Sequence, residues 1–129
     1  MTVGLSAANT ANKLLNTIGR TGTTFTAGAL YVALHTADPG ASGTTAASAV
    51  TTRVSPTFSA ASAGSMAMTS MASTWSMTAT ETISHISFWD ASTAGNFMWS
   101  VALTTSKAVI NGDTLSMSSL TLAFTPIAA

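Results

Sequence analysis

The spacing of apolar residues changes once along the chain, from a helical period to a strand period. Between Ala7 and Ile18, apolar residues recur every three or four positions, as on one face of an α-helix. Ser6 can cap the start of this helix, and Gly19 can end it. From about residue 29, apolar and polar residues alternate, and Thr, Val and aromatic residues become frequent. The pattern predicts one short helix at about residues 7–18, followed by strands.

The first predicted strand runs from Ala29 to Thr36. Within it, Leu30, Val32 and Leu34 alternate with less apolar positions, so one face is expected to be buried. The segment Ala37–Gly40 then ends the strand, because its proline fixes a turn and its glycine tolerates a left-handed exit. A loop rich in small residues follows to about residue 49.

The middle of the chain predicts an edge strand and a change of phase. Pro56 and Phe58 lie in an alternating segment, and the proline favours a sheet edge because it cannot donate to a ladder. Between Met66 and Met77, the apolar positions change from even to odd numbers. A bulge or turn near Ser70 accounts for this change.

The next predicted strand is apolar on both sides. In Thr82–Trp89, Ile86 and Phe88 share one face. The other face is lined by Ile83, His85 and Trp89. We therefore expect a central strand, or one covered by a partner.

Two hairpins and a final strand are predicted after this point. Ala94–Asn96 can form a tight turn before the alternating residues 97–103. The Asn111–Gly112 pair is typical of a type I′ turn, and predicts a hairpin that joins residues 107–110 to Thr114–Ser118. Apolar residues at positions 120, 122 and 124 indicate a last strand after a break at residues 118–119.

These elements predict a single domain over residues 1–129. Short strands recur about every ten residues, and no crossover helix is available to connect parallel strands. The expected fold is all-β, an antiparallel β-sandwich or jelly-roll-like barrel with one short N-terminal helix.

The charge content favours contact with other protein. Four basic and four acidic residues make up 6% of the chain, where about 25% is usual. A surface with so few charges does little to keep copies apart.

The sequence also argues against two other kinds of partner. The cations are scattered, which argues against nucleic-acid binding. The long uncharged run contains too many Ser, Thr, Pro and Gly residues for a membrane span. The N-terminus does not resemble a signal peptide, so we expect synthesis and folding in the cytoplasm of the cell that makes the protein.

The residues that could carry chemistry are few. The chain has two His, four acids and no Cys, so we expect no enzyme activity, metal site or cofactor. Asp38 and Asp113 lie in predicted turns, where short carboxylates bond local backbone N–H groups. The pairs His35 with Asp38 and His85 with Asp90 lack a third metal ligand nearby. Serine is abundant, but the Gly-x-Ser-x-Gly motif of many hydrolases is absent.

Candidate interface residues are those that combine apolar character with an edge, a bulge or a two-sided strand. The tryptophans among them favour a core or a subunit contact, although exposed aromatics can also stack on sugars. Methionine adapts to either setting. The candidate interface consists of Pro56, Phe58, Met66, Met68, Met71, Trp75, His85 and Trp89.

The order of several segments resembles that of small phage proteins often labelled tail-fibre proteins. Leu30–Gly40 follows a short helix, and Thr82–Ala91 ends in Trp-Asp-Ala. A glycine-containing turn at Ser92–Asn96 comes next, followed by Leu103–Lys107 and Asn111–Leu115. The resemblance covers nearly the whole chain but departs from the pattern in the methionine-rich residues 66–77.

This resemblance implies a structural protein of the virion. The leading hypothesis is a capsid decoration protein that clamps the major capsid protein on the outer surface of the shell, as a homo-oligomer such as a trimer. The alternative is a tail or tail-fibre component that binds a host-surface glycan or receptor. In both cases the expected partners are other virion proteins.

Overall fold

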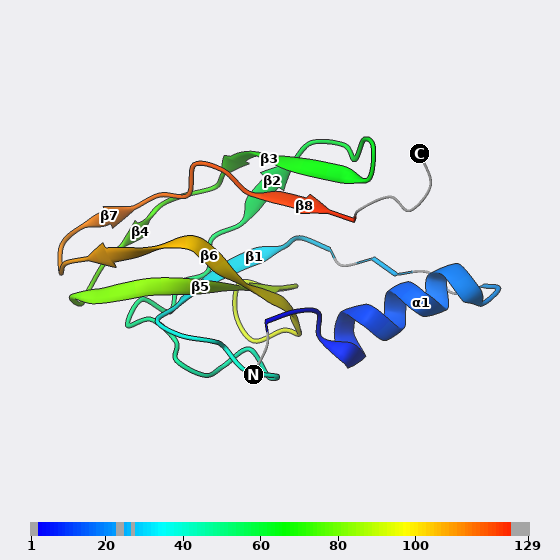
Figure 1. The fold of residues 1–129 in the computed structure, drawn as a ribbon, viewed down its shortest axis with the longest axis horizontal. Helices are drawn as coiled ribbons and strands as arrows, with labels where there is room; N and C mark the ends of the chain where they lie inside the picture. Colours follow the sequence, from blue (N-terminus) through cyan, green and yellow to red (C-terminus); the bar gives the residue numbers. More distant parts are fainter. Residues whose placement is uncertain (1–2, 23–24, 27, 125–129) are drawn as a thin grey trace.

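The fold consists of one helical segment and two layers of short antiparallel strands (Figure 1). The computed structural model describes residues 3–22, 25–26 and 28–124. It confirms the prediction of an all-β fold with a short N-terminal helix. The elements are a π-helical turn (Ala7–Ala11), α1 (Asn12–Gly19), β1 (Tyr31–His35), β2 (Pro56–Phe58), β3 (Ser65–Met71), β4 (Trp75–Ser76), β5 (Glu81–Trp89), β6 (Phe97–Val109), β7 (Thr114–Leu115) and β8 (Thr121–Ala123).

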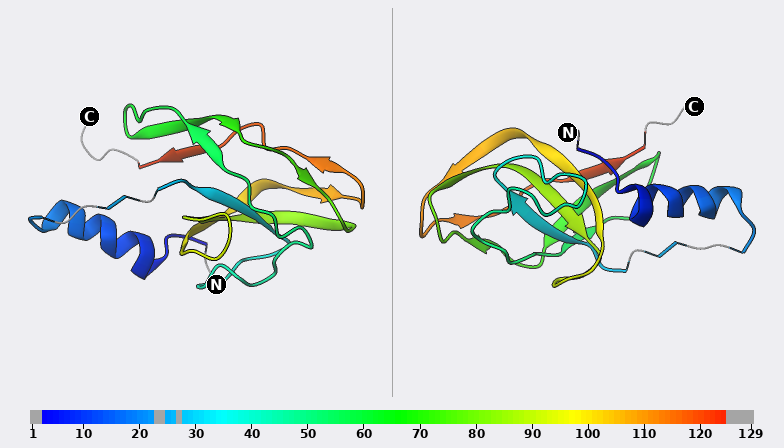
Figure 2. Two further views of the ribbon diagram at one scale, coloured as in Figure 1. Left: turned by 180° about the vertical axis from the view of Figure 1, so that it is seen from behind. Right: turned by 90° about the horizontal axis from the view of Figure 1, so that it is seen from below.

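The helical segment is attached to the body at its beginning. Ser6 caps it as predicted, since its Oγ accepts a hydrogen bond of 3.3 Å from the backbone N–H of Asn9. The Ser6 backbone N–H and the Thr10 hydroxyl both donate to the carbonyl of Met98, each at 2.7 Å. Beyond these contacts α1 extends away from the strands, as Figures 1 and 2 show from three directions.

The first layer is a three-stranded sheet in the order β1-β5-β6. β5 is central, as the two-sided pattern predicts. Its register with β6 shifts between Ile83 and His85 and again between Phe88 and Trp89. The first shift corrects the predicted faces: Ile83 joins Ile86 and Phe88 in the core instead of lying opposite them. Strict alternation could not reveal an irregularity inside the strand.

The second layer contains the sheet β2-β3-β8 and the pair β4-β7. β2, which begins at Pro56, lies at the edge as predicted. Thr57 pairs with Ser70 and Phe58 pairs with Met68, so Thr69 has no partner on β2. This bulge confirms the predicted irregularity near Ser70.

The chain passes between the layers at three points: before β2, between β4 and β5, and after β6. Just before β2, the backbones of Val32 and Val54 exchange hydrogen bonds of 2.9 and 3.1 Å, which attaches the second layer to β1. After β6, a turn returns the chain, with the Asp113 N–H donating to the Ile110 carbonyl at 3.1 Å.

The predicted second hairpin is wrong. β7, beginning at Thr114, pairs with β4 of the other layer and not with β6. Of the two central turn residues, only Gly112 has a positive φ, 95°, so the turn is not type I′. The first predicted hairpin, from β5 to β6, is present but with a wider loop over residues 90–96.

The core lies between the layers. Phe88 is fully buried and stacks on Trp99, with ring centroids 4.6 Å apart. Trp75 on β4 of the second layer belongs to the same buried cluster, and only 1% of its surface is exposed. The buried hydrophobic cluster is Val32, Leu34, Val50, Val54, Trp75, Met77, Ile83, Ile86, Phe88, Met98 and Val109.

The other face of the first sheet is covered by the loop that follows β1. Thr36 and Ser48 donate backbone hydrogen bonds to the carbonyls of Ala46 and Leu34, which holds the loop against the sheet. Gly43 has a φ of 72°, and a Cβ there would lie 2.2 Å from the ring of Phe97. Only glycine permits this approach. Because both faces are covered near the start of β6, Met98 and Ser100 are buried there as well.

Candidate interaction surfaces

A buried hydrogen-bond network lies under the loop that covers β1 and β5. Ser87 Oγ is 2.7 Å from His35 Nε2 and accepts a hydrogen bond of 2.8 Å from Trp89 Nε1. The other ring nitrogen of His35 is 2.9 Å from the carbonyl of Thr45. These partners assign the proton to Nδ1, which donates to Thr45, while Nε2 accepts from the Ser87 hydroxyl.

This network is structural, although a serine beside a histidine resembles a nucleophile and its base. Ser87 is fully buried, and His35 is only 2% exposed, so no substrate reaches the hydroxyl. Burial lowers the pKa of His35 below its ordinary value, outweighing the carbonyls of Thr45 and Ala46, which favour the charged form. The network fixes the polar interior of the first sheet.

Arg53 closes this network toward solvent. Its guanidinium carbon lies 3.8 Å from the centre of the Trp89 ring, an arrangement in which the cation and the ring face attract each other. Its Nη1 donates to the carbonyls of Ala91 and Ala94, at 3.0 and 2.6 Å. Arg53 therefore covers the tryptophan and holds the loop between β5 and β6.

The aspartates stabilise turns. Asp38 Oδ1 accepts from the N–H of Gly40 at 2.8 Å, and Asp113 Oδ2 accepts from the N–H of Ile110 at 3.0 Å. Both findings confirm the predicted turn roles. Asp90 accepts from the backbone and side-chain N–H groups of Asn96, and these bonds lower the pKa of its carboxyl group. Within the ranges that the structure describes, no three His, Asp or Glu side chains gather as metal ligands would.

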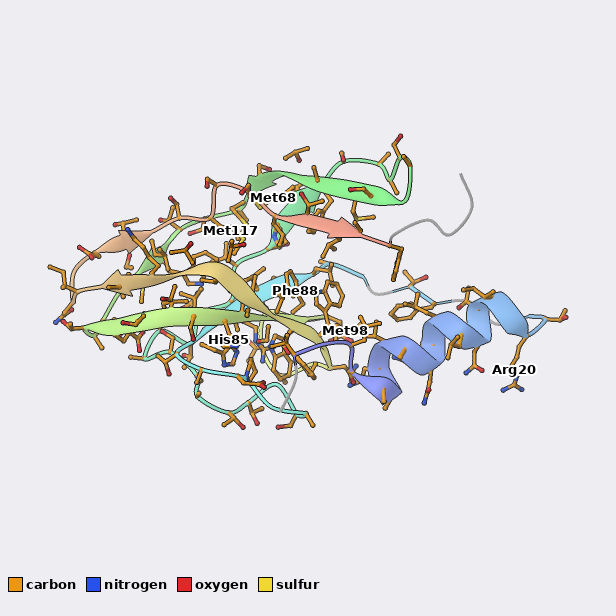
Figure 3. The ribbon with its side chains drawn as sticks, in the orientation of Figure 1. Arg20, Met68, His85, Phe88, Met98 and Met117 are labelled. Carbon is orange, nitrogen blue, oxygen red and sulfur yellow. The ribbon has the colours of Figure 1, made fainter. Side chains whose placement is uncertain are left out.

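The structure divides the predicted interface residues into two groups. Pro56, Trp75 and Trp89 are buried inside the chain, and Trp75 donates from Nε1 to the carbonyl of Thr52 at 2.9 Å. The others are half-buried: Phe58, Met66, Met68, Met71 and His85. Four of these five belong to β2 and β3 of the second layer, whereas His85 lies on the side of β5 away from Phe88 (Figure 3).

The most exposed large apolar residues lie elsewhere. On α1, 67% of Leu15 and 85% of Ile18 are exposed. Ile110 in the turn after β6 and Phe124 after β8 are also exposed, at 60% and 71%. The helical period from Ala7 to Ile18 predicts the apolar face of α1. The period does not show whether another element covers this face.

The surface also has two grooves of several hundred Å³. One, of about 550 Å³, lies at the start of the helical segment and includes Leu5, Ala8 and Ala41. The other, of about 470 Å³, lies beside Arg53 and is lined mainly by hydroxyl side chains, including Thr52 and Thr93. Neither brings together groups that could act as acid and base.

A family model described as podophage GP4 fiber I protein gp80 matches residues 5–125. The chain belongs to this family. The match to this phage fibre family includes every helix and strand of the described structure, from Ala7 to Ala123. It confirms the resemblance to phage tail-fibre proteins and supports a structural role in the virion.

For this fibre-family member, the comparison with curated proteins gives no match. No helix in the part of the chain that the structure describes is long and apolar enough to cross a bilayer.

Proposed function

We propose that this chain is a structural subunit of a phage fibre, and that it acts through contacts with further copies of itself and with neighbouring virion proteins. The family match is the observation that carries this proposal. The chain would then reside in the virion as part of the tail apparatus and would catalyse no reaction.

The use of the charged residues supports this proposal. All four acids bond within the chain: Asp38, Asp90 and Asp113 accept from turn N–H groups, and Glu81 accepts from Ser48 and from the N–H of Ala49. These bonds leave a surface dominated by Ser, Thr and Ala. Such a surface loses little solvation and little side-chain entropy when another protein covers it.

Capsid decoration was the leading hypothesis from the sequence, and the family description now favours the fibre instead. The contact chemistry is the same in both places, because a neutral β-domain can pack against any complementary neighbour. Location in the particle therefore separates the two hypotheses.

Glycan binding receives less support from the geometry. The groove beside Arg53 offers the hydroxyl groups of Thr51, Thr52 and Thr93 to a sugar. However, Trp89 is only 7% exposed and lies under Arg53, so the groove lacks the open aromatic face on which sugars commonly stack. We therefore base the proposal on protein contacts.

The test is to locate the protein in purified particles. Antibody-gold labelling, followed by a reconstruction of the labelled particles, is expected to place the chain on the fibres. Density on the head lattice would instead establish capsid decoration. Absence of the protein from washed particles would overturn both virion hypotheses.

A further inference from the structure

The helix α1 has an apolar side with large exposed residues. Ala11, the last residue of the π-helical turn, and Leu14, Leu15 and Ile18 of α1 follow the spacing i, i+3, i+4, i+7, which places them on one side of the helix. We call these four residues the α1 stripe. Leu15 and Ile18 are among the most exposed large apolar residues, and no residue of α1 is buried.

The other side of α1 already has a contact within the chain. Lys13 Nζ lies 5.5 Å from the centre of the Phe25 ring, and Lys13 falls on the side of the helix away from the α1 stripe. The segment that returns from the helix therefore contacts the polar side. On the apolar side, Leu15 and Ile18 are left to solvent in a single copy, whereas Ala11 and Leu14 are half-buried.

A helix of this length gains little stability from its own hydrogen bonds. α1 has eight residues, and isolated helices shorter than about 12–15 residues are marginal in water. In proteins, helices of this kind are stabilised mainly by packing of the apolar side. An exposed apolar side on a short helix therefore indicates a missing partner.

We propose that the α1 stripe packs against the α1 stripes of further copies of this chain, in a cyclic assembly of three or more subunits. This inference rests on the proposed function, since it identifies the surface through which copies of the fibre subunit associate.

The charge distribution favours copies of the same chain as the occupant. Near the axis of a cyclic assembly, each residue lies close to the same residue of the other copies, so a charge there would face the same charge and be repelled. The α1 stripe carries no charged residue, and the net charge of the chain is zero. The cation of α1, Lys13, lies on the opposite side.

The size of the α1 stripe favours more than two copies. Eight helical residues span about 12 Å, so a single pair of these helices buries far less than the roughly 1,200 Å² of a stable interface. The α1 stripe includes adjacent residues, Leu14 and Leu15, and is therefore wider than the narrow seam of a two-stranded coiled coil. In a closed ring each helix contacts two others, which uses this width and brings the β-domains together.

The first experiment compares the mass of wild-type and charge variants by sedimentation equilibrium at micromolar concentration. We expect wild-type protein to form a defined oligomer. The double variant Leu15→Lys/Ile18→Lys should be monomeric, with apparent self-affinity reduced at least about 100-fold, because each contact would place cations against cations. Since both side chains are exposed in one copy, the monomer should keep its circular dichroism spectrum in the β region.

Two control variants add the same charge outside the α1 stripe. Asn12→Lys changes α1 itself on another side, and Ile110→Lys changes another exposed isoleucine, in the turn after β6. Both should retain the wild-type mass. A wild-type monomer would overturn the inference without affecting the virion role, which the particle labelling tests separately. Loss of the oligomer in Ile110→Lys with retention in Leu15→Lys/Ile18→Lys would place the contact elsewhere and overturn it too.

The second experiment identifies the occupant by disulfide cross-linking. The natural chain has no cysteine, so an introduced thiol has no competing partner. Ile18→Cys should form a disulfide between copies under mild oxidation, whereas Ile110→Cys should not. If Ile18→Cys cross-links only when Ala41→Cys is also present, the helix inserts into the groove near Ala41 of a neighbour, and packing between α1 stripes is wrong.

Discussion

The two layers of the sandwich differ in how completely they are packed. The first sheet, β1-β5-β6, is covered on both faces, by the second layer and by the loop after β1. Its central strand has four consecutive buried residues, from Ile86 to Trp89. The sheet β2-β3-β8 instead consists of two three-residue strands and the seven-residue β3. No residue of β3 is buried.

This difference separates the residues that hold the fold from those available for contact. The first sheet is rich in aromatic and β-branched residues, which have few rotamers and pack in one arrangement. β3 is built from Met, Ser, Thr and Ala, and its methionines are only half-buried. Methionine adapts to different neighbours, so β3 can accept a partner without disturbing the core.

The two layers should differ most in how much stability is lost when a large side chain is truncated. Phe88→Ala removes a fully buried ring that stacks on Trp99, and should lower the free energy of unfolding by about 3–5 kcal/mol. Met68→Ala, in half-buried β3, should lower it by about 1 kcal/mol or less. Urea denaturation followed by tryptophan fluorescence measures both, and equal losses would contradict the division between the layers.

The second prediction concerns the polar interior of the first sheet. Ser87→Ala removes the hydrogen-bond partner of both His35 Nε2 and Trp89 Nε1, and leaves two buried polar atoms unsatisfied. We expect a loss of about 1–3 kcal/mol in the free energy of unfolding. Ser70→Ala is the control, because this exposed serine in β3 should change stability by less than about 0.5 kcal/mol. Similar losses in the two variants would show that the network is not stabilising.

Local pattern predicted the elements of the first sheet well. Alternation identified β1 and the central strand β5, and the change of phase between Met66 and Met77 located the bulge at Thr69. Proline chemistry identified the edge position of β2. In each case the cause of the structure acts over a few residues, so it is visible in the sequence.

Pairings that depend on distant residues could not be predicted in this way. An Asn-Gly turn indicates that the chain reverses, but not which strand β7 will join, and its partner β4 lies about 40 residues earlier. The coverage of Trp89 by Arg53 likewise depends on a loop far away in sequence. The exposed side of α1 was predicted as an apolar face, and only the fold shows that the β-sheets do not cover it.

A smaller effect is expected where Arg53 closes the first sheet toward solvent. Arg53→Lys keeps the charge, but an ammonium group cannot stack flat on Trp89 while bonding the carbonyls of Ala91 and Ala94. The free energy of unfolding should fall by about 1 kcal/mol. Amide hydrogen exchange should accelerate in residues 91–96. The control Lys107→Arg changes an exposed cation of β6 and should leave both measurements unchanged.

The smallest effect is a dependence of stability on pH that comes from the buried network. Burial lowers the pKa of His35 below its ordinary value of 6.5, and the nearby side chains of His85 and Arg53 act in the same direction. In the unfolded chain His35 therefore binds a proton more readily than in the fold. Stability should be full above about pH 6.5 and should decline as the pH falls from there toward the lower folded-state pKa.

The range from pH 6.5 down to about 5 isolates this histidine from the acids. The ordinary pKa of an aspartate is 3.8, and the bonds from Asn96 lower that of Asp90 further, so the Asp90 carboxyl group titrates below this range. His35→Asn should be less stable at every pH but should lose most of the slope. Urea denaturation at several pH values measures the slope. A slope that survives in His35→Asn would mean that another group causes the pH dependence and that the burial of His35 does not.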